Sequence, residues 1–409
     1  MTDDEARRDP ASAGRRRPLL WAALAAAITF VSIIGLWYRQ QADTAALSSS
    51  TSAAGLIIES QAKGTSLTAV GRTHGLDEPC TAWLVDVRAE ASSPAYAVTT
   101  GRCVGLTDTT TVLMDEPVDG ASIDFNAFAP LTTAVLPNLV TTSIDEVVWA
   151  SSRGNDLAIL QLGSTYGELS QQGVDPISLA APPGAGERIL TAGVPVQSVP
   201  DDQQYLRATT CSAGKPADVV EDVWWWPGLV TSDCQGILMG SWGSPALNPA
   251  GEAQAMVITT SLGAQDGTCG PGAPCEVHDA QVALVPDTTY LTPVAELGAC
   301  FPQGTFTLGG GCPLEDPVGV TPASGPRVAA PGTTAEVRLD RRLAAPDLLS
   351  DKHGPLGSTD CAARAGWSDA VPARDWELDL RMPQQGWMLV CAGSPEQPTP
   401  VVIEVDPGS

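Results

Sequence analysis

The sequence predicts an all-β body, and two observations carry that prediction. From residue 55 to 314 the chain consists of short apolar or β-branched runs separated by turn residues, such as TAWLVDV, AYAVTT, NDLAILQL and AQAMVITT. The 409 residues include 34 prolines and 40 glycines but only 5% aromatic residues, which is typical of many short strands and loops. Several runs are almost continuously apolar, as expected for strands buried inside small barrels.

The N-terminus predicts a membrane anchor. Residues 18–38 (PLLWAALAAAITFVSIIGLWY) carry no charge and are long enough to cross a bilayer as a helix. Three arginines at 15–17 precede this run, so residues 1–17 are expected to form a cytoplasmic tail and the body to be extracytoplasmic. Because small residues follow, a cleaved signal peptide is the alternative, although the apolar run is longer than usual for one. Residues 39–54 predict a flexible tether.

Charge and cysteine content both describe the body beyond this segment. It carries 16 basic and 43 acidic residues after position 39, a net charge of −27, which argues against nucleic acid as a partner and is simplest to interpret as a solubilising coat.

An even number of cysteines in an exported chain predicts disulfides rather than a metal centre. Spacing alone leaves the connectivity open, and pairing in chain order predicts Cys80–Cys103, Cys211–Cys234, Cys269–Cys275, Cys300–Cys312 and Cys361–Cys391.

The last part of the chain predicts a second β domain. Residues 315–330 contain three prolines and no strong periodicity, which indicates a linker. Residues 331–409 then alternate apolar and polar positions, as in WELDLRM, which favours a small immunoglobulin-like or fibronectin-like β-sandwich. The run VAELGACF (294–301) is the one segment before the linker that predicts a helix.

Three stretches point to a family when they are taken together: EPCTAWLVDVRAEASSPAYAVTTGRCVG (78–105), SRGNDLAILQL (152–162) and DCQGILMGSWGSPALN (233–248). Their order and spacing resemble the trypsin-like (chymotrypsin-fold) serine peptidases, especially secreted bacterial ones with a Gly-x-Ser-Gly-Ser-Pro turn. The resemblance covers roughly residues 55–313. It implies a trypsin-like double β-barrel, assigned here to residues 55–314.

The same resemblance implies a degenerate catalytic triad. The family's general base precedes the second cysteine of the first stretch, and here that position is Arg102, which stays protonated and cannot accept a proton from serine. The orienting aspartate matches Asp156, and the nucleophilic serine matches Trp242. We therefore expect Arg102 to form an ion pair with Asp156. We also expect Trp242 to cover the oxyanion hole, which the family builds from two backbone N–H groups, here those of Gly240 and Trp242.

A rearranged active site is the alternative. Ser241 and Ser244 flank Trp242, but a shift of one residue would turn the hydroxyl away and break the turn at Gly243. His74 and His278 do not lie where the fold would deliver a general base. The sequence therefore favours a chain without peptidase activity over an active endopeptidase.

The remaining segments give only weak indications of binding sites. In EDVWWWPGL (221–229), three consecutive tryptophans, Trp224, Trp225 and Trp226, cannot all face the same way in a strand, so at least one is expected near the surface, where with Trp242 it could bind a partner. Because similar Glu-x-x-Trp segments occur in the active bacterial relatives that this domain resembles, a structural role is the favoured interpretation. The acidic run 114–124 lacks ordered calcium-ligand spacing, NPAGEA (248–253) predicts a hairpin turn, and no motif predicts a cofactor.

These observations predict a membrane-anchored, extracytoplasmic homologue of serine peptidases that binds or scaffolds at the cell surface, with a protein or cell-wall partner left unidentified. The other hypotheses are an active peptidase with a rearranged site, and a sensor or assembly subunit in which the barrel is a spacer.

Overall fold

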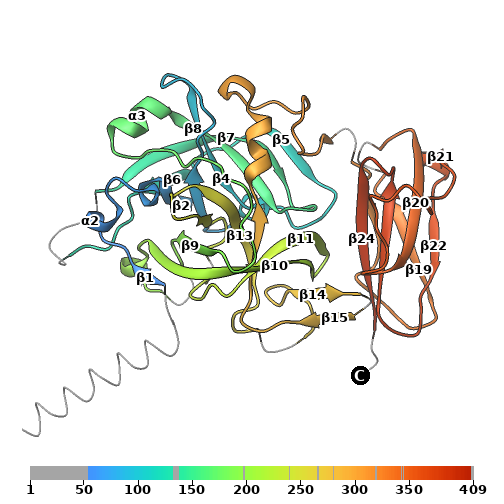
Figure 1. The fold of residues 1–409 in the computed structure, drawn as a ribbon. Coiled ribbons are helices and arrows are strands. Elements are labelled where there is room, and N and C mark those ends of the chain that lie inside the picture. The colour runs from blue at the N-terminus through green and yellow to red at the C-terminus, as the bar shows by residue number, and fades with distance from the viewer. Residues whose placement is uncertain are drawn as a thin grey trace, which may run out of the picture. The chain divides into compact units, whose positions relative to one another are not determined.

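Two closed β-sheets and a smaller pair of sheets make up the computed structural model (Figure 1). It describes residues 54–131, 138–196, 199–238, 240–264, 267–279, 281–317, 320–341, 343 and 345–406. The predicted tail, anchor and nearly all of the tether lie outside these residues. No helix within the described ranges is long and apolar enough to cross a bilayer. The prediction of an all-β body is confirmed.

The first sheet closes into a barrel. Its strand order is β5-β7-β6-β2-β3-β4-β8, and an additional pairing of β7 with β8 joins the two ends of the six strands from β7 to β8. The closure depends on the length of β7, which pairs with β6 near its start, with β5 near its end and with β8 along its other edge. The strands are β2 (Val70–His74), β3 (Thr81–Leu84), β4 (Pro94–Thr99), β5 (Val112–Pro117), β6 (Ser122–Phe125), β7 (Val140–Ser151) and β8 (Leu157–Thr165).

The second sheet closes in the same way. Its order is β11-β16-β13-β12-β9-β10-β14-β15, with β1 paired to β10 and an additional β10–β11 pairing that closes the ring. The 15 residues of β10 allow it to pair with β9, β1, β11 and β14. The strands are β1 (Gly55–Leu56), β9 (Arg188–Gly193), β10 (Arg207–Glu221), β11 (Trp224–Ser232), β12 (Pro245–Leu247), β13 (Ala253–Thr260), β14 (Cys275–His278), β15 (Gln281–Leu284) and β16 (Thr289–Pro293).

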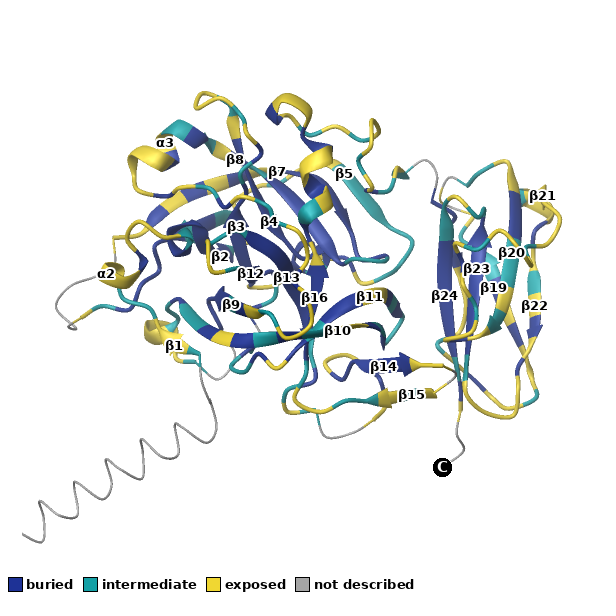
Figure 2. Cartoon of the chain, viewed as in Figure 1, coloured by how far each residue is buried: buried dark blue, intermediate teal, exposed yellow. Residues whose placement is uncertain are grey.

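Apolar side chains fill these barrels. Figure 2 shows much of the length of the inner strands in the dark blue of buried residues. The largest fully buried side chains include Trp83, Trp149, Trp226 and Tyr290. Two closed barrels of antiparallel strands are consistent with a trypsin-like fold.

Helices are short and peripheral. Within the described residues the α-helices are α2 (Glu59–Ala62) and α3 (Tyr166–Gln171), the latter begun by a capping box between Thr165 and Glu168. The predicted helix at 294–301 is instead a 3-10 helix, Ala295–Cys300. It is held between Pro293 and Pro302, and its last residue is tied to Cys312 by a disulfide, so it has no room to extend.

The C-terminal part consists of two sheets around its own apolar cluster, with orders β17-β19-β22 and β18-β24-β23-β20-β21. Two of its strands, β17 and β18, fall within residues 315–330, so the predicted linker is partly wrong. Each is only two residues long and supplies a sheet edge, and the neighbouring prolines lie outside the strands. The strands are β17 (Ala323–Ser324), β18 (Val328–Ala329), β19 (Thr334–Leu339), β20 (Leu348–Pro355), β21 (Val371–Pro372), β22 (Leu378–Arg381), β23 (Trp387–Gly393) and β24 (Pro398–Val405).

The five disulfides join the cysteines in chain order, as predicted: Cys80–Cys103, Cys211–Cys234, Cys269–Cys275, Cys300–Cys312 and Cys361–Cys391. No free cysteine remains in the described chain. Such a set of bridges is typical of proteins in an oxidising, extracytoplasmic compartment.

Candidate functional site: a buried arginine in an aromatic box

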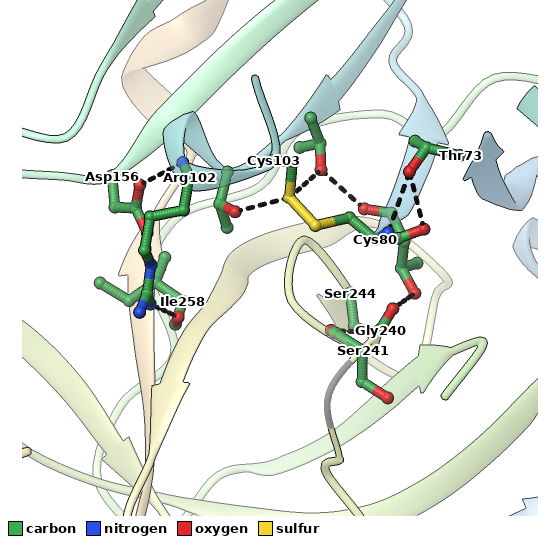
Figure 3. The surroundings of a disulfide bond; sticks show 12 residues. Thr73, Cys80, Arg102, Cys103, Asp156, Gly240, Ser241, Ser244 and Ile258 are labelled. Carbon is green, nitrogen blue, oxygen red and sulfur yellow. Dashed lines mark hydrogen bonds and ion pairs between the residues drawn. A yellow bond between two sulfur atoms is a disulfide. The ribbon is translucent and has the colours of Figure 1, made fainter. Parts of the chain in front are cut away.

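Arg102 lies in a 3-10 turn, Gly101–Val104, directly after β4. Its backbone N–H donates to Asp156 Oδ1 over 3.1 Å and its Nε donates to Oδ2 over 2.9 Å, as Figure 3 shows. A Cβ at position 101 would lie 2.9 Å from Ser151 O and from Ser152 Oγ. Glycine is therefore needed for the turn to approach the end of β7 closely enough to form this ion pair.

Asp156 is positioned by the loop between β7 and β8. It is fully buried and has a φ of 43°, a left-handed conformation that costs free energy in a residue other than glycine. Its Oδ1 also accepts a hydrogen bond from Ser152 Oγ over 3.1 Å. The carboxylate is thus held by one ion pair and two further hydrogen bonds, with no contact to solvent.

Sequence reasoning missed a second carboxylate beside Arg102. Glu221, the last residue of β10, is fully buried, and its Oε1 lies 3.3 Å from Arg102 Nη1 and accepts from the backbone N–H of Gly272 over 2.8 Å. Arg102 Nη2 also donates to the carbonyl of Ile258 in β13. The guanidinium of the first barrel is therefore bound on one side by Asp156 and on the other by two groups of the second barrel.

Aromatic rings surround the same guanidinium. Arg102 Cζ lies 5.3 Å from the ring centroid of Trp224, 5.4 Å from that of Trp226 and 5.0 Å from that of Trp242. Trp224 and Trp226 share a face of β11 and stack at 5.8 Å with an interplanar angle of 7°. All three distances fall within the range of favourable cation–π contacts. We call these three tryptophans the aromatic box.

Two of the three consecutive tryptophans lie inside the protein, and Trp225 is half-buried. Trp224 is 6% exposed and Trp226 is fully buried, with its Nε1 donating to Ser152 O over 2.9 Å. Trp225 points to the other face and packs against a separate apolar cluster that includes Leu389. The alternation of strand side chains explains why one sequence run of three tryptophans divides between two environments.

Electrostatics favour a charged arginine at this position. Burial by itself would lower the pKa of Arg102, but the carboxylates of Glu221 and Asp156 outweigh it, so its pKa is raised above the usual value. The side chain cannot act as a general base. What the arrangement does is hold two buried carboxylates and three indoles around one fixed cation.

The turn that carries Trp242, residues 240–243, is anchored to the first barrel. Thr81 Oγ1 donates to Gly240 O over 2.8 Å, and the Thr81 backbone N–H donates to Trp242 O over 2.9 Å. Gly243 has a φ of 88°, and a Cβ there would lie 2.0 Å from Thr81 O, so only glycine fits. The Trp242 side chain is half-buried and packs against the apolar cluster that contains the Cys211–Cys234 disulfide.

Neither neighbouring serine has a base beside it among the residues that the structure describes. Ser244 is fully buried and its Oγ donates to Ser241 O over 2.5 Å, while Ser241 is 3% exposed. The chain's three histidines pair with carboxylates elsewhere: His74 with Asp124 at 2.9 Å, His278 with Glu276 at 2.7 Å and His353 with Asp351 at 3.2 Å. Within the described ranges no group of three His, Cys, Asp or Glu residues is placed to hold a metal.

Known proteins resemble this chain only remotely. No protein-family model matches it, and neither does any curated protein. Among solved structures, it is similar to the active form of the Rv3671c protease from M. tuberculosis, with 12% identity over 59% of this chain and 83% of that one and a TM-score of 0.36. It is similar to AL20, a thermostable serine protease from an extremophilic microorganism, with 17% identity over 55% of this chain and 91% of that one and a TM-score of 0.34.

A third similar structure is the MamO protease domain from Magnetospirillum magneticum, with 13% identity over 56% of this chain and 94% of that one and a TM-score of 0.33. All three structures are described as proteases. Because identities and TM-scores are this low, the likenesses do not bear on activity, and the proposal that follows rests on the contacts of Arg102.

Proposed function

We propose that this chain is a trypsin-like serine-peptidase homologue that has lost catalysis and serves as a binding or scaffolding module, anchored in the cell membrane through residues 18–38 with its body extracytoplasmic. The observation that carries the proposal is the ion-pair network of Arg102 with Asp156 and Glu221 inside the aromatic box. In the family that the sequence resembles, the general base and the nucleophile occupy the positions of Arg102 and Trp242.

The chemistry of these groups supports the loss of catalysis. Acyl transfer needs a nucleophile and a group that accepts its proton. Arginine does not accept a proton at physiological pH, and an indole ring is not an acyl acceptor. Replacing the histidine or the serine of a working triad reduces turnover by about a million-fold. Both replacements together leave no route for the reaction at this site.

An active peptidase with a rearranged site is the second candidate, with Ser241 or Ser244 as nucleophile. Two observations weigh against it. The Ser244 hydroxyl is committed to the Ser241 carbonyl at 2.5 Å, and both side chains are buried. All three histidines are engaged with carboxylates at other positions.

A fluorophosphonate probe tests the proposal directly. The purified full-length chain should remain unlabelled under conditions that label an active serine peptidase to completion. Labelling at Ser241 or Ser244, abolished by the corresponding alanine variant, would refute the loss of catalysis and support the second candidate.

A restored triad tests whether the site is placed correctly. The variant R102H/E221Q/W242S supplies a base and a nucleophile, and its E221Q change removes the carboxylate that would otherwise lose its cation. We expect this variant to be labelled at position 242 at least about 10³-fold faster than W242S alone, because an unassisted serine lacks its base. Equal labelling rates would contradict the proposed positions of base and nucleophile.

A further inference from the structure

A small, nearly closed cavity lies in the second barrel next to the turn that carries Trp242. Its volume is about 10 Å³, which is enough for one atom of the size of a water molecule. Ser241 and Ser244 of the turn line one side, and residues of β9 and β10 line another. This cavity is separate from the aromatic box and does not depend on the missing triad.

The register of β9 and β10 explains its lining. Arg207 pairs with Gly193, and Thr209 pairs with Thr191, so these four positions share one face of the two strands. Gly193 contributes no side chain, and a Cβ there would lie 2.0 Å from Ser244 Oγ. Glycine therefore leaves the space open between the arginine and the turn.

Two hydrogen-bond donors that border the cavity have no partner among the described residues. Thr191 is 1% exposed, and its Oγ1 is buried without a hydrogen bond. The Nε of Arg207 is likewise buried without one. Buried donors normally find a partner, because leaving one unpaired costs about 1–3 kcal/mol. Both residues line the same cavity, so a single bound species could satisfy both groups.

The charge around the cavity indicates what that species is. None of its described lining residues is an aspartate or glutamate. Burial lowers the pKa of Arg207, and no neighbouring carboxylate offsets this effect among the described residues. The guanidinium is thus a half-buried cation without a counter-ion there, in a body whose net charge is strongly negative. A bound anion would neutralise it, whereas a water molecule would only accept hydrogen bonds.

We propose that this cavity is a binding site for one monatomic anion of the halide class, with Arg207 Nε and Thr191 Oγ1 as donors. Its small volume favours a monatomic ion over sulfate, phosphate or a carboxylate. The anion would connect β9 and β10 to the turn at Ser241, so that the turn carrying Trp242 is braced by a ligand as well as by Thr81.

Thermal unfolding at constant ionic strength tests the site. Replacing potassium gluconate by potassium chloride should raise the melting temperature by about 2 °C once chloride is about tenfold above its dissociation constant. Potassium bromide should act like chloride. General salt screening is the same in all of these solutions and cannot produce the difference.

Three variants test whether the rise in melting temperature depends on Thr191 and Arg207. T191V keeps the side-chain shape but removes the hydroxyl, so it should melt no lower than the native chain in gluconate and should lose the rise in chloride. R207Q should lose the rise as well. R188Q, which changes an exposed arginine of β9, should keep it. Retention of the chloride effect in T191V and R207Q would overturn the proposal.

Anomalous scattering from crystals grown in bromide gives an independent readout. The expected peak lies within hydrogen-bond distance of Arg207 Nε and Thr191 Oγ1. Equal melting temperatures in chloride and gluconate, together with no bromide peak, would mean that the cavity holds only water and would overturn the proposal. Neither result depends on whether the chain is an enzyme, so this test is distinct from that of the proposed function.

Discussion

At the scale of single residues, Arg102 makes contacts that a histidine could not make. Its planar guanidinium directs donors to Asp156, to Glu221 and to the carbonyl of Ile258, and it presents flat faces to three indoles. An imidazole has only two ring nitrogens and a shorter reach. Arginine at this position therefore stabilises the contact between the two barrels.

Removing Arg102 should destabilise the protein strongly. R102A leaves the carboxylates of Asp156 and Glu221 buried without their cation, and breaking a buried ion pair in this way costs about 3–5 kcal/mol of unfolding free energy. Urea unfolding followed by tryptophan fluorescence measures the loss. Adding D156N and E221Q to R102A should recover part of it, because neutral amides need no counter-charge.

The matched control is R338A. Arg338 also pairs with an aspartate, Asp379, at 2.8 Å, but its own side chain is only half-buried and that of Asp379 is exposed, so solvent screens the pair. Its unfolding midpoint should equal that of the native chain within error. An R102A variant that unfolds at the native midpoint would contradict the buried network.

At the scale of elements, a carboxylate ties three neighbouring strands of the first barrel together. Asp124 of β6 accepts from Thr141 Oγ1 of β7 over 2.6 Å and pairs with His74 Nε2 of β2 over 2.9 Å. The hydrogen bond from His74, followed by the one from Thr141, lowers the pKa of Asp124 below its usual value. The charged form of this residue is thus favoured by folding.

Asp124 should contribute to acid sensitivity. Because its folded-state pKa is depressed, its contribution is fully present above the unfolded pKa of about 4 and is lost as the pH falls through the folded pKa. D124N should therefore unfold more easily than the native chain at about pH 6, and this difference should shrink as the pH falls below about 4. Melting temperatures recorded from about pH 6 to about pH 2 measure it, and D119N, in an exposed turn, serves as the control. A difference independent of pH would contradict the prediction.

At the scale of the whole molecule, contacts and cross-links hold residues 54–409 in one compact unit. The buried Arg153 donates to Glu315 Oε1 over 2.8 Å and to Thr399 Oγ1 over 2.6 Å, which joins the first barrel to β24. One apolar cluster contains Val220 of β10 together with Leu389 of β23. The barrels and the C-terminal sheets therefore share part of their core.

Two disulfides in that cluster should differ in their contribution to stability. Cys361–Cys391 spans 30 residues and Cys269–Cys275 spans 6, and both are buried in the same apolar surroundings. Loop-closure entropy predicts a loss of about 4 kcal/mol for C361A/C391A and about 2 kcal/mol for C269A/C275A. Urea unfolding of the two double variants, each the control of the other, measures the difference. Equal losses would show that packing outweighs chain entropy here.

The β character of the body and its local cross-links could be predicted from the sequence because both depend on neighbouring residues. Strand runs such as AYAVTT carry their own alternation and propensity, and each disulfide joins cysteines 30 or fewer residues apart. The ion pair of Arg102 with Asp156 was also expected, but only through a resemblance that supplied the positions of both residues. The segment 315–330 was misjudged because edge strands of two residues leave no periodic pattern.

The sequence by itself thus determined an all-β, disulfide-rich, acidic body. Its resemblance to a family adds the prediction that Arg102 and Trp242 stand at the positions of that family's base and nucleophile. Only the tertiary structure decided what these two residues do. Glu221 lies 119 positions from Arg102 and meets it because β10 closes the second barrel against the first. No local sequence pattern predicts that Trp224 and Trp226 contact that guanidinium. Contacts across two closed barrels depend on the packing of the whole chain, so short-range sequence patterns cannot predict them.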